Sequence, residues 1–87
     1  MLIMDRHIIK LIMYNSTSTI IEIPEGAIFL CAIEEFDSIC LVFEGDPNGM
    51  KEQKTFYAYE AYGIIHGSEQ YIGSVKLNGI NHFIYSD

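Results

Sequence analysis

Two almost uninterrupted apolar runs constrain most strongly what this chain can fold into. They span residues 27–33 and 39–43, and the acidic link Glu34-Glu35-Phe36-Asp37-Ser38 joins them. A strand with one face in water alternates apolar and polar residues, and these runs do not. They predict two central strands of a hairpin centred on 36–37, each covered on both faces. We expect one cover to come from the rest of the chain and the other from a second copy of the protein.

Turn residues divide the rest of the chain into short β-forming segments. The strands predicted from these segments span 8–14, 19–23, 27–33, 39–44, 55–62, 71–77 and 80–85. Pro24 and Gly26 predict a type I turn at 23–26, and Asn78-Gly79 predicts a hairpin. No segment has a long helical period, so no helix is available to cover a sheet. The prediction is one mostly-β domain, 1–87, folded as a small antiparallel sandwich or partly open barrel of about six to seven strands.

The net charge and the hydrophobic content of the chain limit the kinds of partner that it is expected to bind. Twelve acidic residues against five basic ones give a net charge of −7, which disfavours binding to a nucleic-acid backbone or an anionic membrane. The acidity either keeps the protein soluble or meets a basic protein partner. Because 49% of only 87 residues are hydrophobic, the chain has more apolar surface than a small core hides, and we expect a homo-oligomer.

The two cysteines and the N-terminal residues indicate a reducing compartment. Residues 1–13 lack the pattern of a secretory signal, and no stretch reaches the length of a membrane span. We therefore expect a cytoplasmic protein in which Cys31 and Cys40 are small buried hydrophobes. The predicted hairpin places Cys31 opposite Val42 and Cys40 opposite Ile33, so a disulfide is possible but not favoured.

No motif for catalysis or metal binding stands out. His7, His66 and His82 lack the close spacing of a structural zinc site. No Gly-x-Ser-x-Gly elbow is present, and Ser68, His66 and Glu69 are neighbours in one loop, which rarely converge as a triad. The sequence therefore predicts no catalytic residue, no cofactor, no metal and no enzyme activity.

Two groups of residues are candidates for binding. Aromatic rings with a polar tip are suited to stacking on a nucleobase and to anchoring an interface. The candidate ligand-binding residues are Tyr57, Tyr59, Tyr62 and His66, with the rings stacking and the imidazole donating a hydrogen bond. Acidic side chains at the strand ends are suited to a basic partner. The candidate partner-binding residues are Glu34, Glu35, Asp37 and Asp46.

Five short motifs, taken in order, resemble a known family. They are "IEIPEGAIFL" at 21–30, "DP" at 46–47, "KTFYAY" at 54–59, "YIGSVKLNG" at 71–79 and "HFIYSD" at 82–87. Together they resemble a family of small uncharacterised domains that is common in tailed-phage genomes. Members of that family carry a Gly-Thr-Gly-His element after the fifth strand, where this chain has 60–65 and only Gly63 corresponds. The resemblance implies a phage origin and no established activity.

The functional expectation combines these features with that resemblance. It is a phage-encoded, non-enzymatic binding protein in the host cytoplasm that counters a bacterial defence system. It would either inhibit a host complex through its acidic residues or sequester a nucleotide signal at its tyrosines, in a pocket shared between subunits. The alternative is a small structural or assembly protein whose homo-oligomer is its function.

Overall fold

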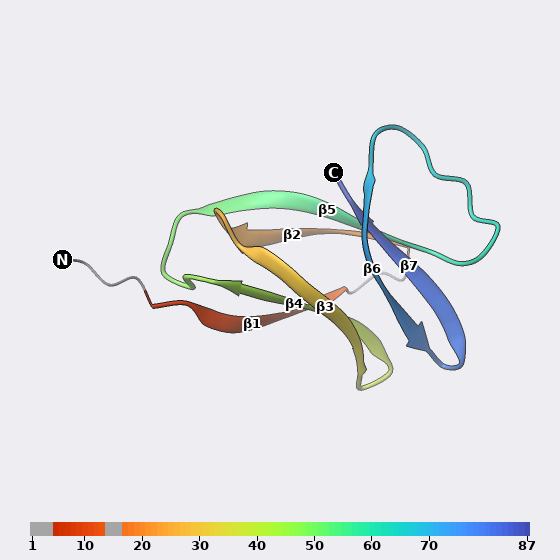
Figure 1. Ribbon diagram of the computed structural model, residues 1–87, viewed down its shortest axis with the longest axis horizontal. Coiled ribbons are helices and arrows are strands. Elements are labelled where there is room, and N and C mark those ends of the chain that lie inside the picture. The colour runs from red at the N-terminus through yellow and green to blue at the C-terminus, as the bar shows by residue number, and fades with distance from the viewer. Residues whose placement is uncertain (1–4, 14–16) are drawn as a thin grey trace.

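The computed structural model describes residues 5–13 and 17–87, and within them every regular element is a β-strand. The elements are β1 (His7–Met13), β2 (Ser18–Pro24), β3 (Ile28–Glu35), β4 (Ser38–Gly45), β5 (Lys51–Tyr59), β6 (Gln70–Leu77) and β7 (Ile80–Ser86). A three-stranded sheet has the order β1-β4-β3, and a four-stranded sheet has the order β2-β5-β7-β6 (Figure 1). All pairings are antiparallel. The predicted mostly-β sandwich is confirmed, and the sheets are not closed into a barrel. In the described part of the chain no helix could cross a membrane.

The strand boundaries differ most from the prediction in β5. This strand begins at Lys51 instead of Thr55, because the polar residues before Thr55 pair with the end of β2. It ends at Tyr59 instead of Tyr62, where the backbone turns and Tyr62 adopts a positive φ of 69°. The predicted end of the first strand at Tyr14 lies outside the described residues.

Three tight turns set the registers of the strands. Phe36-Asp37 has φ values of 52° and 61°, and Asn78-Gly79 has 52° and 81°, which are the two left-handed residues of a type I′ hairpin turn. The predicted hairpins are therefore present, with Cys31 opposite Val42 and Ile33 opposite Cys40. The predicted type I turn at 23–26 is wrong. The Ala27 amide donates to the Pro24 carbonyl at 3.1 Å, and Gly26 has a φ of 76° at the third position, as in a type II turn.

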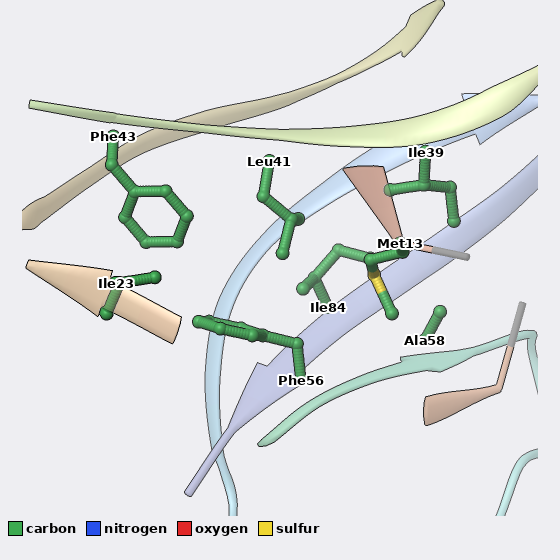
Figure 2. Close-up of a cluster of buried hydrophobic side chains, with 8 residues drawn as sticks. All are labelled: Met13, Ile23, Ile39, Leu41, Phe43, Phe56, Ala58 and Ile84. Carbon is green, nitrogen blue, oxygen red and sulfur yellow. The ribbon is translucent and has the colours of Figure 1, made fainter. Parts of the chain in front are cut away.

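The core lies between the two sheets and is centred on β4. Ile39, Leu41 and Phe43 project from β4 toward Phe56 and Ala58 of β5 (Figure 2). Met13, Ile23 and Ile84 complete this buried cluster from three other strands. Of the two strands that were predicted to be central, β4 lies in the middle of the three-stranded sheet as predicted. The prediction for β3 is wrong, because β3 forms an edge of that sheet.

The outward side of β4 is buried without a second layer over it. Cys40 and Val42 point away from the core yet are only 2% and 7% exposed. Lys10 lies opposite Val42 on β1, and its Nζ contacts both carboxylate oxygens of Glu35 on β3 at 2.9 Å. This ion pair joins β1 to β3 across β4, the strand that carries Cys40 and Val42. A second copy is therefore not required to bury β4.

A glycine permits the close contact between β3 and β6. The ring of Phe29 packs edge-on against Phe43 at a centroid distance of 5.6 Å. A Cβ on Gly73 would lie 3.0 Å from Cε2 of that ring, so a larger residue here would require the ring to shift. The bulges between Phe29 and Cys31 and between Tyr71 and Gly73 occur at these same points, so both strands bend where the sheets meet.

Candidate functional site

The outer face of the four-stranded sheet carries four tyrosines in contact. Since Phe56 and Ala58 of β5 point into the core, the alternation of a strand directs Tyr57 and Tyr59 outward. The ring centroids lie 6.2 Å apart for Tyr57–Tyr59, 5.4 Å for Tyr59–Tyr85 and 5.6 Å for Tyr71–Tyr85. We call Tyr57, Tyr59, Tyr71 and Tyr85 the tyrosine cluster.

A pocket of about 410 Å³ opens beside this cluster. One wall is the loop 60–69 between β5 and β6, which projects beyond the sheets near the C-terminus (Figure 1). We call this cavity the tyrosine pocket. Its lining consists of Tyr57, Tyr59, His66, Gly67, Ser68, Glu69 and Asp87. The pocket therefore joins the flat rings of a sheet to the polar side chains of a loop and the last residue of the chain.

Hydrogen bonds fix two polar groups of the pocket. The Tyr59 hydroxyl donates to Glu69 Oε1 at 2.8 Å, and burial together with this bond raises the pKa of Tyr59 to about 12. The phenol therefore remains a donor at neutral pH. The Thr55 amide donates to Asp87 Oδ1 at 3.1 Å. Glu69 Oε2 is shielded from solvent and accepts no hydrogen bond from the described residues.

These groups define the chemistry that the pocket can perform. Its two carboxylates only accept hydrogen bonds, so they favour N–H groups and disfavour phosphate. Aromatic faces offer stacking area for a planar ring. His66 lies on the exposed loop and can donate to an acceptor at the pocket mouth. The arrangement is suited to holding a planar ligand with N–H donors, with any phosphate outside.

The structure brings together three of the four residues predicted to bind a ligand. Tyr57, Tyr59 and His66 line the tyrosine pocket. Tyr62 does not join them, since it is fully exposed and lines a second pocket of about 400 Å³ on the other side of Tyr59. The grouping of Tyr62 with the others fails because β5 ends at Tyr59 and the chain turns away.

Sequence reasoning missed the acidic lining and half of the tyrosine cluster. Glu69 and Asp87 carry no local pattern that marks a site. Tyr71 comes opposite Tyr85 only because a bulge shifts the register of the hairpin by one residue, and the turn at 78–79 alone would pair Tyr71 with Ser86. Tyr85 itself was detectable, since alternation along β7 places it outward beside the buried Ile84.

The second pocket contains a buried histidine that faces a carboxylate. His82 is 6% exposed, and its Nδ1 lies 3.0 Å from the Ile80 carbonyl oxygen. A carbonyl only accepts, so Nδ1 carries a proton and Nε2 faces Glu60 Oε1 at 3.6 Å. This pair is an ion pair only when the ring is protonated on both nitrogens.

The predicted partner-binding acids are mostly engaged within the chain. Glu34 accepts a hydrogen bond from the Asn78 amide at 2.9 Å, which ties the two hairpins together. Glu35 pairs with Lys10, and the Asp46 carboxylate accepts from the Asn48 amide at 3.0 Å in the turn after β4. Asp37 is exposed at the β3–β4 turn. A basic partner would have to compete with these contacts, so the inhibitor version loses support.

In the described residues, the cysteines form no disulfide and no cluster of potential metal ligands is present. Both thiols are free. Cys40 is buried as predicted, whereas the same prediction for Cys31 is wrong, because β3 is an edge strand and leaves this side chain exposed. Within 5–13 and 17–87, no three side chains of His, Cys, Asp or Glu converge as metal ligands would.

A second candidate surface is the outer face of the three-stranded sheet. Ile8, Ile12 and Ile28 are 65%, 42% and 52% exposed there, and the strand registers place all three on the side opposite the core. We call this surface the aliphatic face. Its outward residues are Ile8, Lys10, Ile12, Ile28, Cys31, Ile33, Glu35, Cys40, Val42 and Glu44.

Comparison of the chain with protein-family models, with curated proteins and with solved structures finds no match.

Proposed function

We propose that this protein is a non-enzymatic binding protein that sequesters a nucleotide or nucleoside, base first, in the tyrosine pocket. The observation that carries the proposal is the convergence of stacking rings and acceptor-only carboxylates on one cavity. Its volume of about 410 Å³ is within the usual range for small-molecule sites. Binding rather than chemistry is proposed because the lining contains no nucleophile paired with a base.

The orientation of the ligand follows from charge. Glu69 and Asp87 would repel a phosphate, but they accept hydrogen bonds from the amino and imino groups of a base. His66, on the exposed loop, can then donate to a phosphate or ribose oxygen at the mouth. Together with the resemblance to phage domains, this arrangement supports a counter-defence role in the host cytoplasm, in which the protein removes a nucleotide signal from solution.

Native mass spectrometry after incubation with a nucleotide extract from infected bacteria tests this proposal. A fixed extra mass on the protein is expected, and that mass would identify the ligand. The double variant Tyr57→Ala/Tyr59→Ala should lose the ligand while keeping a folded sheet by circular dichroism. Tyr62→Ala is the matched control, since Tyr62 lines the other pocket. Retention of the ligand by the double variant, or the absence of any bound mass, would overturn the proposal.

The aliphatic face supports the alternative of a structural homo-oligomer. Its Lys10 lies 2.9 Å from Glu35, and its Glu44 Oε1 lies 2.7 Å from Nη1 of Arg6, which precedes β1. Two copies of a protein with a net charge of −7 repel each other least where their charges are locally balanced. The aliphatic face therefore combines exposed isoleucines with acidic side chains whose charges are neutralised by ion pairs.

Light scattering coupled to size exclusion tests this second candidate. A dimer or larger species is expected, and Ile8→Lys/Ile28→Lys should convert it to a monomer. Both isoleucines are exposed and lie opposite Glu44, so the substitutions leave the core intact. The control is Ile20→Lys on β2, which is 67% exposed on the other sheet. A monomer of the unaltered protein at high concentration would exclude the oligomer.

A further inference from the structure

We propose that the open edge of β2 binds an extended, basic segment of a partner protein as an added strand. This inference goes beyond the proposed function, because none of the residues that line the tyrosine pocket lies at this edge. The partner segment would close a side of the sandwich that the chain itself leaves open.

The two sheets meet closely along one side of the sandwich only. On that side the ring of Phe29 on β3 packs against Gly73 of β6. On the other side the edges of β1 and β2 make few contacts, and a cavity of about 340 Å³ lies between them. It is lined by residues 10–12 of β1 and 19–22 of β2. We call this opening the β1–β2 seam.

The β1–β2 seam is apolar both at its floor and at its rim. Leu11 and Ile21 pack against the buried core cluster and line the cavity, so the hydrophobic interior reaches the surface here. Ile12 and Ile20 also line it and are 42% and 67% exposed. An apolar side chain that entered the seam would remove part of this surface from water, which is favourable.

The edge of β2 that faces away from β5 has unpaired backbone groups. The Ala58 amide donates to the Thr17 carbonyl at 2.9 Å, and the register continues from that pair with Ser18 opposite Tyr57. Because alternate residues of an antiparallel strand bond to the same neighbour, the odd-numbered residues of β2 bond to β5. The even-numbered residues direct their N–H and C=O groups to the other side, where no described residue pairs with them. They are Ser18, Ile20 and Glu22.

The other three sheet edges are less suited to an added strand. β3 and β6 each contain a bulge, and β1 carries Lys10 at its middle, which are two common ways of protecting an edge. β2 pairs with β5 without a bulge, so its free groups recur at every second residue. Another extended strand presents groups at the same spacing. The occupant that matches this edge is therefore an extended segment.

The charge at the β1–β2 seam indicates what kind of strand it accepts. Lys10 is neutralised by Glu35, whereas the Glu22 carboxylate is exposed and has no ion-pair partner among the described residues. The residue opposite Glu22 on an added strand would lie on the same face, so a lysine or arginine there would be paired. A second copy is less suited, because it has a net charge of −7 and two of its five basic residues, Arg6 and Lys10, are already in ion pairs.

Titration of the full chain with designed peptides tests the inference. The probe is a short capped peptide of alternating valine and lysine, which would present valine to the seam and lysine to Glu22. Its control alternates valine and glutamate and so keeps the strand propensity of the apolar positions. We expect the lysine peptide to bind at least about tenfold more tightly than the glutamate peptide. A lysine peptide that is N-methylated at adjacent central residues cannot pair fully along either edge, so it should not bind. This last comparison separates strand addition from general attraction to an acidic protein.

Hydrogen exchange measured by NMR locates the added strand. In the free protein the Ile20 and Glu22 amides should exchange faster than the Ile21 amide, which bonds to β5. The lysine peptide should slow the exchange of both by at least about tenfold.

Substitution of Glu22 supplies the protein side of the test. Glu22→Lys should weaken binding of the lysine peptide by about threefold to tenfold, since an exposed ion pair is replaced by a repulsion. Glu25→Lys makes the same change of charge in the turn after β2, outside the seam, and should keep the affinity.

Several outcomes would overturn the inference. They are no binding of the lysine peptide, equal binding of the glutamate or the N-methylated peptide, and protection confined to amides outside β2. Protection of the Ile20 and Glu22 amides that grows with protein concentration, without any peptide, would show that a second copy occupies the edge and would overturn it as well. The proposed function would stand in each case, because nucleotide binding at the tyrosine pocket is measured separately.

Discussion

The two outer faces of the sandwich are built from strands of similar length but differ in what they present to solvent. The outer face of the four-stranded sheet gathers aromatic rings with polar hydroxyl tips, and the hydroxyl of Tyr59 donates to Glu69. The aliphatic face presents Ile8, Ile12 and Ile28, whose side chains have no polar atoms. The first face is hollowed by a loop, whereas the second is a sheet surface that the Lys10–Glu35 ion pair crosses.

This difference suits the tyrosine face to binding a small ligand and the aliphatic face to association with another protein surface. Orientation of a small ligand requires fixed polar groups in a cavity, and only the tyrosine face combines them with apolar area. Aliphatic side chains on a flat sheet favour contact with another apolar surface and specify little else. The two candidate functions therefore belong to different sheets, and substitutions on one face should leave the other unaffected.

The largest expected effect contrasts neighbouring residues on the two sides of β5. Phe56 is 2% exposed in the core, so Phe56→Ala should destabilise the fold by about 3–5 kcal/mol. Tyr57 is only half-buried on the outer face, so Tyr57→Ala should cost about 1 kcal/mol or less and mainly weaken ligand binding. Urea denaturation measures both. If Tyr57→Ala destabilised the fold as much as Phe56→Ala, the tyrosine cluster would be a structural element and not a binding face.

A smaller effect is expected where the two sheets meet. In Gly73→Ala the new methyl group would lie 3.0 Å from Cε2 of Phe29, and such overpacking generally costs about 1–3 kcal/mol. Ser74→Ala, at the next and exposed position, should change stability by less than about 0.5 kcal/mol. The double variant Gly73→Ala/Phe29→Leu should recover part of the loss, because the shorter side chain makes room. Additive effects of the two substitutions would show that the contact does not limit stability.

The cysteines report whether the aliphatic face is covered. Both lie on this face, but Cys31 is exposed and Cys40 is buried, and burial together with the nearby Glu35 carboxylate raises the pKa of the Cys40 thiol. A thiol reagent should therefore modify Cys31 quickly and Cys40 only after unfolding. If a second copy covers the face, modification of Cys31 should slow as the protein concentration rises. A rate independent of concentration would contradict the oligomer.

Much of the fold was predictable because its signals are local. Alternation along 55–59 correctly separates the inward Phe56 from the outward Tyr57 and Tyr59, and the Asn78-Gly79 hairpin follows from its turn residues. The position of β3 was not predictable in this way. An apolar run indicates burial on both faces of a strand, but Ile28 and Cys31 of β3 are exposed. β3 is an edge strand, and its apolar run looks the same in the sequence as that of a central strand.

The tyrosines of the candidate site were predictable from the sequence, whereas its acidic residues were not. Two tyrosines two residues apart on a strand must share a face, so the contact of Tyr57 with Tyr59 follows from the sequence. The approach of Glu69 to Tyr59 depends on how a loop of about ten residues returns to the sheet, and loop paths of this length have no simple pattern. A bulge beside Gly73 in β6 brings Tyr71 to the cluster. A glycine inside a strand is a general signal of a bulge, but it does not say that Tyr71 will come opposite Tyr85.

The smallest effect concerns the ionisation of a single hydroxyl on the tyrosine face. Because the pKa of Tyr59 is raised from 10 to about 12, the folded state holds this proton more tightly than the unfolded chain does. Its contribution to stability is therefore fully present below pH 10 and is lost as the pH rises toward about 12. A spectroscopic titration of the phenolate band should resolve one late-ionising tyrosine. Glu69→Gln should move that transition to lower pH, since it removes the negative charge beside the hydroxyl, whereas Glu60→Gln on the far side of Tyr59 should leave it in place. A transition unchanged in Glu69→Gln would show that burial alone raises the pKa, and the carboxylate would then lose its place beside the rings.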